Sequence, residues 1–130
     1  MGSRWMVMLV AAMVLSAVGT DAMSNLNASR KLRHIVLYKF KDSATEAQVR
    51  EVVAAFSALP KQIPSVIGFE HGTNVSGEGK SDGLTHAFVV TFRDEAGRDE
   101  YLAHAAHQKY VELVRDRREK VVVFDYWADE

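Results

Sequence analysis

The segment that most constrains the fold of this chain is Arg33–Lys41, which reads Arg-His-Ile-Val-Leu-Tyr-Lys-Phe-Lys. β-Branched and aromatic side chains fill it, and neither glycine nor proline interrupts it, so it predicts a β-strand. Side chains alternate across a strand, and both faces of this one are largely apolar. One face holds His34, Val36, Tyr38 and Phe40, and the other holds Ile35, Leu37 and Lys39. Such a strand needs cover on both sides, which helices on one face and a second sheet on the other would provide.

Size and composition indicate one globular domain. The chain has 130 residues, and 48% of them are hydrophobic, which is enough for a real core. A formal net charge of −1 leaves no basic surface for nucleic acid. The chain contains no cysteine, which excludes a disulfide framework, a thiolate nucleophile and a cysteine-based zinc site. No motif indicates a cofactor.

The first part of the chain has the pattern of a signal peptide. Arg4 precedes an uninterrupted run of apolar and small residues, Trp5–Val18, and the small residues of Gly19–Ala22 are suited to cleavage. We therefore expect a signal peptide over 1–22 and a protein that is exported to the periplasm or secreted. A polar tether is expected over 23–32.

Two alternatives to a cleaved signal peptide stay open. An uncleaved membrane anchor is one, although the apolar run is shorter than the roughly 20 residues of a spanning helix. Initiation at Met23 is the other, and it would make the protein cytoplasmic. In each case the folded domain is expected over 33–127.

Beyond the first strand, helical and extended patterns alternate. Thr45 and Gln48 fit a capping box, and the apolar spacing after them predicts a helix that Pro60 stops. Strands are expected at Val66–His71 and Leu84–Phe92, with a long glycine-rich loop between them.

The last part of the domain predicts two helices and a strand. Asp94 can cap the first helix, and His104–His107 is expected to be the joint to the second. Basic residues gather in Arg115–Lys120, and we interpret them as the solvated C-terminal end of that helix, where cations suit the helix dipole. Val121–Trp127 is the final strand, and it is again apolar on both faces.

The order of these elements predicts the fold class. Strand, helix, strand, strand, helix pair and strand make an α+β sandwich of the ferredoxin-like type, with a four-stranded antiparallel sheet and helices on one face. A single sandwich would leave the second apolar face of the sheet in water. Packing two copies sheet to sheet covers that face, so we expect a homodimer that forms a dimeric α+β barrel.

These segments resemble the stress-responsive A/B barrel family. The resemblance covers nearly the whole predicted domain and rests on His34–Lys41, Gly83–Phe92, Tyr101–His107 and Glu119–Tyr126. It implies a homodimer whose two sheets close into a barrel, with a pocket between each sheet and its helices. The family commonly has proline where this chain has Ala105, which bears on the rigidity of the joint.

One branch of that family, the plant polyketide cyclases, implies site residues. Histidines matching His34, His86 and His107 and a tyrosine matching Tyr101 line the site of that branch, and the tyrosine–histidine pair acts in an aldol-type ring closure. A further pocket tyrosine of the branch falls on Phe56 here, so one hydroxyl is missing. The resemblance implies catalytic roles for His107 and Tyr101. It implies a ligand-binding wall that includes His34, His86, Val36, Phe56 and Phe88.

The residues themselves also indicate acid–base chemistry. His34 and His86 each begin an apolar strand face, so neighbouring strands would place both at the same end of a small cavity. Imidazole titrates near neutral pH, and beside the phenol of Tyr101 the ring of His107 could take a proton next to a carbonyl. The alternative is a structural role, in which these groups hydrogen-bond to backbone or water.

Three other kinds of site are disfavoured. His104 and His107 have a spacing that a helical turn brings together, but no matching carboxylate accompanies them, so no metal site is expected. Gly79-Lys80-Ser81 lies in the loop Gly72–Gly83 and lacks the earlier glycine and the following helix of a phosphate-binding loop. No serine has the glycine elbow of a nucleophile. His104 and His71 are expected at the surface.

Two functions from different classes remain. One is a dimeric binding module whose pocket takes a small hydrophobic or aromatic ligand and catalyses nothing. The other is a cofactor-free lyase or cyclase that acts on a carbonyl compound. The absence of a pocket hydroxyl at Phe56 favours the first.

Overall fold

The computed structural model describes residues 29–129. The predicted signal peptide, 1–22, and most of the predicted tether lie outside the described residues. No helix within the described range has the length and apolar character needed to cross a membrane. The elements are, in chain order, β1 (Leu32–Phe40), α2 (Glu46–Gln62), β2 (Gly68–Thr73), β3 (His86–Phe92), α3 (Glu95–Ala103), α4 (Ala105–Arg115) and β4 (Arg118–Trp127).

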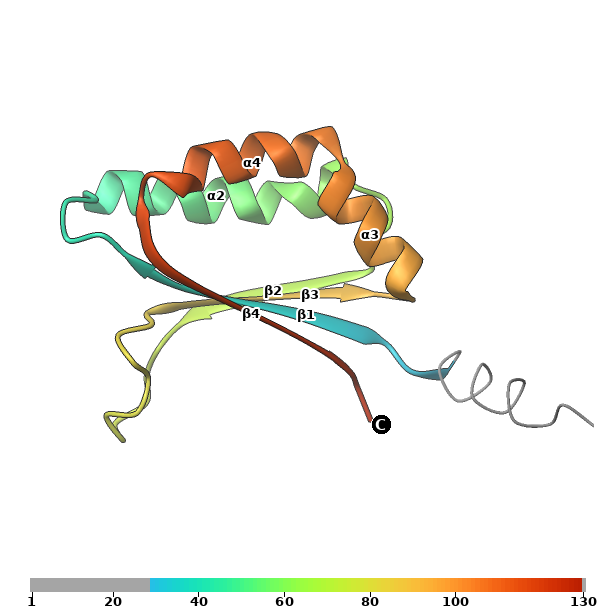
Figure 1. The fold of residues 1–130 in the computed structure, drawn as a ribbon, viewed down its shortest axis with the longest axis horizontal. Helices are drawn as coiled ribbons and strands as arrows, with labels where there is room; N and C mark the ends of the chain where they lie inside the picture. Colours follow the sequence, from blue (N-terminus) through green and yellow to red (C-terminus); the bar gives the residue numbers. More distant parts are fainter. Residues whose placement is uncertain (1–28, 130) are drawn as a thin grey trace, which may run out of the picture.

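The four strands form one sheet in the order β2-β3-β1-β4, and every neighbouring pair is antiparallel. The three helices cover one face of this sheet, and the other face is open (Figure 1). The predicted fold class, a ferredoxin-like α+β sandwich, is therefore confirmed. Because β1 and β3 are the two central strands, they carry most of the core.

The alternation predicted for the first strand is confirmed. Leu32, His34, Val36 and Tyr38 are buried under the helices, whereas the residues between them are half-buried on the open face. The register places Val36 opposite Phe88 of β3 and Val123 of β4. The positions that share one face of β1 therefore continue across the sheet.

Helix α2 begins as predicted and ends later than predicted. Thr45 accepts a hydrogen bond from the backbone N–H of Gln48, and the Gln48 side chain accepts one from the Thr45 N–H, which completes the capping box. The prediction that Pro60 stops the helix is wrong, because the helix continues to Gln62. A proline removes one hydrogen bond near the helix end. The last turn is held instead by burial of Leu59 and by the Ile63 N–H, which donates to the Leu59 carbonyl at 2.9 Å.

The joint between α3 and α4 spans fewer residues than predicted. Asp94 caps α3 through a 2.8 Å hydrogen bond from the Gly97 N–H. His104 alone forms the break, since its backbone is extended and its ring nitrogen accepts from the Ala106 N–H at 3.0 Å. His107 therefore lies in the first turn of α4 and not in a loop. His104, expected at the surface, is a partly buried helix cap.

The interpretation of the basic cluster is partly wrong. Helix α4 ends at Arg115, and β4 begins at Arg118. Arg118 pairs with Phe40 across an irregularity in β1, and Lys120 pairs with Lys39. Partner strands also set the other boundaries: the β2–β3 ladder runs from Gly68–Thr91 to Thr73–His86, so both strands begin two residues later than their patterns predict.

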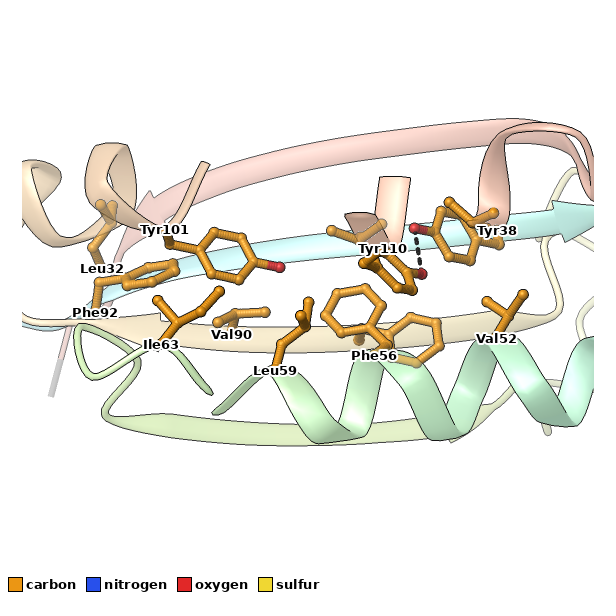
Figure 2. Packing of buried hydrophobic residues seen from close by; sticks show 13 residues of the cluster. Leu32, Tyr38, Val52, Phe56, Leu59, Ile63, Val90, Phe92, Tyr101 and Tyr110 are labelled. Carbon is orange, nitrogen blue, oxygen red and sulfur yellow. Dashed lines mark hydrogen bonds between the residues drawn. The ribbon is translucent and has the colours of Figure 1, made fainter. Parts of the chain in front are cut away.

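The core between sheet and helices is rich in aromatic rings. Phe56 of α2 lies parallel to Phe88 of β3 with ring centroids 4.2 Å apart. The hydroxyls of Tyr38 and Tyr110 share a hydrogen bond of 2.9 Å within this core (Figure 2). The hydroxyl of Tyr101 points along the same layer toward these two tyrosines and away from Leu32 and Phe92 (Figure 2).

The open face of the sheet carries a second apolar surface. Phe124 is 62% exposed and Tyr126 is 40% exposed, both on β4. The register places Ile35 of β1 beside Phe124 and Leu37 beside Val122. The loop between β2 and β3 extends beyond the sheet on the side away from the helices (yellow in Figure 1). The two-sided apolar character predicted for the first and last strands is thus present.

Candidate acid–base cleft

A cleft of about 360 Å³ lies where β1 and β4 meet the helices. Its apolar wall includes Val36, Phe56, Leu102, Val111, Val121 and Val123, and its polar wall includes His34, Tyr38, Arg98, Asp99, Tyr101, His107, Tyr110, Arg118 and Asp125. An apolar hollow with a few converging polar groups is the usual form of a small-molecule site. Five of the seven residues predicted for the site therefore lie together here: His34, Val36, Phe56, Tyr101 and His107.

His107 is placed by the helix joint. Its Nδ1 lies 3.1 Å from the carbonyl oxygen of Leu102, and because a carbonyl only accepts, Nδ1 carries the hydrogen. In the neutral ring the lone pair is then on Nε2. Burial is the largest influence on the pKa of His107 and lowers it, so the neutral ring is favoured at neutral pH. His107 is therefore arranged as a base.

Tyr101 lies next to His107 and supplies a hydroxyl. The two ring centroids are 4.5 Å apart. Tyr101 is 1% exposed, and burial raises its pKa, so the phenol stays protonated. Among residues 29–129 the one fully buried side-chain polar atom without a hydrogen-bond partner is Ser65 Oγ, so the Tyr101 hydroxyl is not sealed in the core but opens to the cleft. In this position the hydroxyl can donate a hydrogen bond to the oxygen of a ligand.

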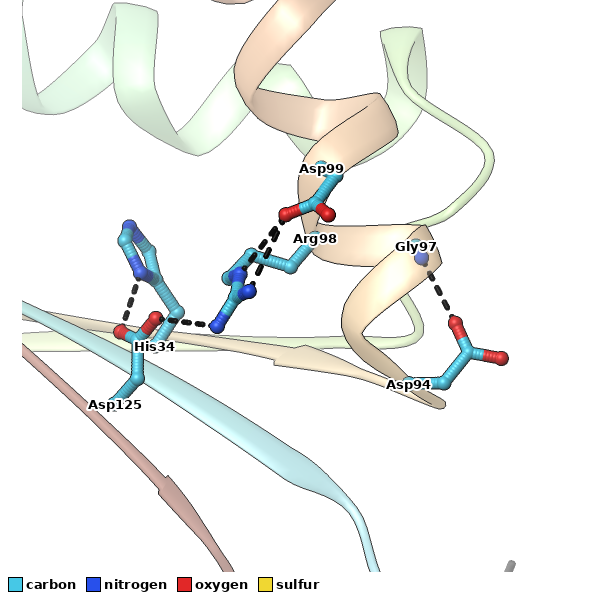
Figure 3. A network of polar contacts seen from close by, with 6 residues as sticks. All are labelled: His34, Asp94, Gly97, Arg98, Asp99 and Asp125. Carbon is cyan, nitrogen blue, oxygen red and sulfur yellow. Dashed lines mark hydrogen bonds and ion pairs between the residues drawn. The ribbon is translucent and has the colours of Figure 1, made fainter.

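His34 is held by a carboxylate that sequence reasoning missed. Its Nδ1 lies 2.7 Å from Asp125 Oδ1, and the other oxygen of Asp125 accepts from Arg98 at 3.2 Å (Figure 3). Arg98 also contacts Asp99. When Nδ1 of a neutral His34 ring donates its hydrogen to the Asp125 carboxylate, Nε2 of the same ring is left as an acceptor. The signal was present in the last strand, where Asp125 is an acid at the end of the apolar alternation of Val121 and Val123.

The opposite end of the cleft holds the tyrosine pair and a cation. Burial raises the pKa of both Tyr38 and Tyr110, so both hydroxyls are neutral. The guanidinium carbon of Arg118 lies 5.9 Å from the centroid of the Tyr38 ring, a cation–π distance. Sequence reasoning missed all three side chains as site residues, and Arg118 because it was assigned to a helix end.

His86 and Phe88 do not reach the cleft lining. His34 and His86 were expected at the same end of a cavity, and this is wrong because β1 and β3 are antiparallel. His86 pairs with Tyr38, four residues along β1 from His34, roughly 13 Å at the rise of a strand. Phe88 is fully buried behind Phe56.

His86 instead borders a second hollow of about 340 Å³ beside the β2–β3 loop. It hydrogen-bonds to Thr85 at 2.8 Å, and its ring meets Phe40 edge-on at 5.0 Å. Burial, with a smaller effect from His71, lowers the pKa of His86. Lys80 and Ser81 of the glycine-rich loop line the same hollow. His71 is exposed, as expected.

No group of three or more histidine or acidic side chains within the described range is arranged to hold a metal ion. The cleft instead gathers two histidines, the phenol of Tyr101 and two carboxylates. These groups can remove a proton, return it, and hold an oxyanion between the two steps.

Fold and cleft together define an α+β protein of the ferredoxin-like type with a cleft between its layers that is lined by ionisable side chains. Residues 32–128 match the family described as "Stress Responsive A/B Barrel Domain", and the chain belongs to that family. Olivetolic acid cyclase from Cannabis sativa is 34% identical over 95 residues, 73% of this chain and 94% of the relative. The stress-response A/B barrel domain-containing protein HS1 from Arabidopsis thaliana is 31% identical over 99 residues, 76% of this chain and 91% of the relative.

Solved structures share the fold. Hydroxynitrile lyase from Passiflora edulis has a TM-score of 0.73 at 25% identity, over 77% of this chain and 94% of that one. A dimeric ferredoxin-like protein from Jannaschia has a TM-score of 0.64 at 28% identity, over 74% of this chain and 97% of that one. The family resemblance drawn from the sequence is confirmed.

Proposed function

We propose that the chain is a homodimeric acid–base enzyme of the lyase or cyclase type. Its substrate is a small compound with a carbonyl or hydroxyl group on an apolar or aromatic body. The observation that carries the proposal is the pairing of His107, whose Nε2 lone pair is free, with the hydroxyl of Tyr101, which opens to the same cleft. A binding site that only encloses an apolar ligand has no need of a lone pair and a hydroxyl donor side by side in its wall.

The chemistry follows from the two side chains. Nε2 of His107 takes a proton from a carbon or hydroxyl group of the substrate, and the electron pair left behind moves toward an oxygen. The hydroxyl of Tyr101 donates a hydrogen bond to that oxygen as its negative charge develops. When a new carbon–carbon bond has formed, the proton returns from His107 to the product oxygen; when a leaving group has departed with the electrons of its broken bond, the proton goes to that group. His34, which Asp125 holds in place, lies next to Tyr101, and there it orients the substrate.

Relatives with named activities support a catalytic proposal over a binding one. A cyclase and a hydroxynitrile lyase are both similar to this chain over most of its folded part. The two names denote different reactions, and neither is assigned here as the reaction of this chain.

The homodimer is proposed on the open face of the sheet. Ile35, Leu37, Val122 and Phe124 would lie in water in a single subunit, and a second copy would cover them. The similar Jannaschia protein is dimeric. Because the cleft is on the opposite face of the sheet from this surface, each subunit carries its own cleft.

A second candidate function is a binding module without turnover. Phe56 favours it, because the related branch has a tyrosine there and the ring of Phe56 stacks on Phe88 with no polar group. In this case mandelonitrile or another small aromatic compound would occupy the cleft unchanged.

Turnover of two probes separates the candidates. Racemic mandelonitrile releases benzaldehyde when its hydroxyl proton is removed and cyanide leaves, and nitrobenzisoxazole opens to a phenolate when its ring carbon loses a proton. We expect His107→Gln to lower the wild-type rate about a hundredfold to ten-thousandfold and Tyr101→Phe to lower it about a hundredfold. The matched control, His71→Gln, changes a histidine outside the cleft and keeps the rate.

Two results would contradict the enzyme proposal. One is a wild-type rate no higher than that of buffer with both probes. The other is turnover that His107→Gln leaves unchanged. Binding of mandelonitrile without release of benzaldehyde would favour the binding module.

We also propose that the protein is exported, on the pattern of residues 1–22 alone. Fractionation of the native host with N-terminal sequencing tests this. Mature protein that starts near residue 20 or 23 and lies outside the cytoplasm would support export. An intact Met1 in the membrane fraction would support the anchor, and cytoplasmic protein starting at Met23 would overturn export.

A further inference from the structure

The polar groups of the cleft form one continuous line with an arginine at each end. From one end, ring contacts join Tyr110 to His107 at 6.5 Å, His107 to Tyr101 at 4.5 Å, and Tyr101 to His34 at 6.0 Å. His34 then leads through Asp125 to Arg98. At the start of the line, Tyr110 bonds to Tyr38, over whose ring Arg118 lies. The acid–base pair is therefore in the middle of the cleft.

The two arginines differ in their partners. Arg98 contacts both carboxylates of the cleft, Asp99 at 3.2 Å and Asp125 at 3.2 Å (Figure 3). Arg118 makes no ion pair with any carboxylate among residues 29–129. The cleft lining holds two arginines and two aspartates, and Arg98 uses both aspartates. The end of the cleft at Arg98 thus carries one guanidinium and two carboxylates, and the other end holds Arg118 with no carboxylate partner among the described residues.

The surroundings of Arg118 suit a carboxylate. The side chain is partly buried and its guanidinium lies on an aromatic face, which holds the group in place. A guanidinium presents parallel N–H donors that match the two oxygens of a carboxylate. The formal charges of the two arginines and two aspartates in the lining cancel, so Arg118 offers a local partner for one carboxylate group, and a phosphate dianion would need further donors. Arg118 has no carboxylate partner in the part of the chain that the structure describes, and a ligand would supply one.

We propose that the ligand of this cleft is an organic acid whose carboxylate binds Arg118 while its carbonyl lies between His107 and Tyr101. The apolar side chains Val36, Phe56 and Val111 enclose the body between these two ends. Arg118 then acts as the residue that selects the substrate class and sets its direction in the cleft. The inference rests on the proposed function for the position of the carbonyl, but the carboxylate contact is a binding property and can be measured without turnover.

The test compares two ligands that differ in one charge. Benzoylpropionate carries an aromatic ketone and a carboxylate, and benzoylpropionamide carries the same ketone and a neutral amide. Calorimetric titration of the wild-type protein is expected to give at least about tenfold tighter binding of the acid, since a hydrogen bond to a charged group contributes roughly 1.5–3 kcal/mol. Arg118→Gln removes this preference, and Arg118→Lys keeps part of it.

Arg115→Gln is the matched control. It removes an exposed arginine that does not line the cleft, so the preference for the acid stays. The thermal midpoint of each variant reports whether the fold is intact, which matters for Arg118→Gln because that side chain packs on Tyr38. Arg118→Lys, which keeps the charge, covers the case in which Arg118→Gln fails to fold.

Three outcomes would overturn the inference. They are equal or undetectable binding of the acid and the amide by the wild type, a preference that survives Arg118→Gln, and tighter Arg118-dependent binding of phenethyl phosphate than of benzoylpropionate. Acid preference without turnover of the earlier probes would retain this inference and remove the enzyme proposal. Turnover without acid preference would do the opposite.

Discussion

The two faces of the sheet carry the same kind of side chain but differ in how deeply those side chains are buried. On the helix side, Phe88 is fully buried and stacks on Phe56. On the open side, Phe124 is 62% exposed. Both are aromatic residues on strands of one sheet, so hydrophobicity alone does not distinguish a core residue from a surface one. The difference teaches that the helices decide which face becomes the interior of the subunit, and that the other face is left for a partner.

The largest expected effect removes a ring from the covered face. Phe88→Ala should lower the free energy of unfolding by about 3–5 kcal/mol, since it leaves a cavity beneath Phe56. Phe124→Ala removes the same ring from the open face. Urea unfolding over a dilution series separates the two, because the cost of Phe88→Ala persists at low protein concentration while that of Phe124→Ala fades with the dimer. Equal costs at every concentration would mean that the two faces are not different environments within the subunit.

The next effect is on assembly. Phe124→Asp places a charge in the proposed sheet-to-sheet contact and should raise the dimer dissociation constant by at least about thirtyfold, the effect of losing roughly 2 kcal/mol at a hot spot. Val123→Asp is the matched control, since Val123 is the adjacent residue on β4 and faces the cleft. Sedimentation should show twice the chain mass for the wild type and for Val123→Asp, and a monomer for Phe124→Asp. Dissociation by Val123→Asp alone would place the partner surface on the wrong face.

A smaller effect concerns polar groups on the covered face. Tyr38→Phe leaves the buried hydroxyl of Tyr110 without its 2.9 Å partner, which should cost about 1–3 kcal/mol. Replacing both tyrosines by phenylalanine should recover part of this loss, because no unpaired group remains. On the open face, Tyr126→Phe should change the free energy of unfolding by less than about 0.5 kcal/mol. A double variant less stable than Tyr38→Phe would contradict the argument.

The smallest effect is on pH dependence. Burial lowers the folded-state pKa of His107 below its ordinary value of 6.5, so the unfolded chain binds the proton more readily. Stability contributed by neutral His107 is therefore present above pH 6.5 and is lost as the pH falls from there through the folded pKa. The probe rates should likewise hold at pH 6.5 and fall below it, because a protonated ring is no base. Exposed His71, which does not line the cleft, serves as control for the rates: His71→Gln should leave the acid limb of the rate curve unchanged, and His107→Gln should shift the stability curve.

Local signals in the sequence predicted what depends on neighbours along the chain. The capping box at Thr45, the Asp94 cap and the two-face alternation of the first strand were all correct, because each depends on residues within a few positions. The errors lie where distant residues decide. Pro60 did not end α2, since burial of Leu59 and Ile63 holds the last turn on the core. Strand pairing, not local composition, sets where β2, β3 and β4 begin.

The site residues show the same division between what local sequence determines and what distant residues decide. His107 and Tyr101 come from neighbouring turns across one helix joint, so their closeness could be foreseen. His34 and His86 were expected together, but antiparallel pairing separates them along the strand. Asp125 is 91 residues from His34 in the chain, and only the pairing of β1 with β4 brings them within 2.7 Å.

By itself, the sequence determined the alternation of the strands, the caps of the helices and the presence of two apolar faces, because each is set by spacing within a segment. The tertiary structure decided which face is covered, which histidine meets a carboxylate, and which arginine of the cleft has no carboxylate partner within the described range. Those outcomes depend on the order and direction of strands far apart in the chain. Arg118 shows this most directly: its sequence neighbours suggest the end of a helix, and its partner strand places it in the wall of the cleft.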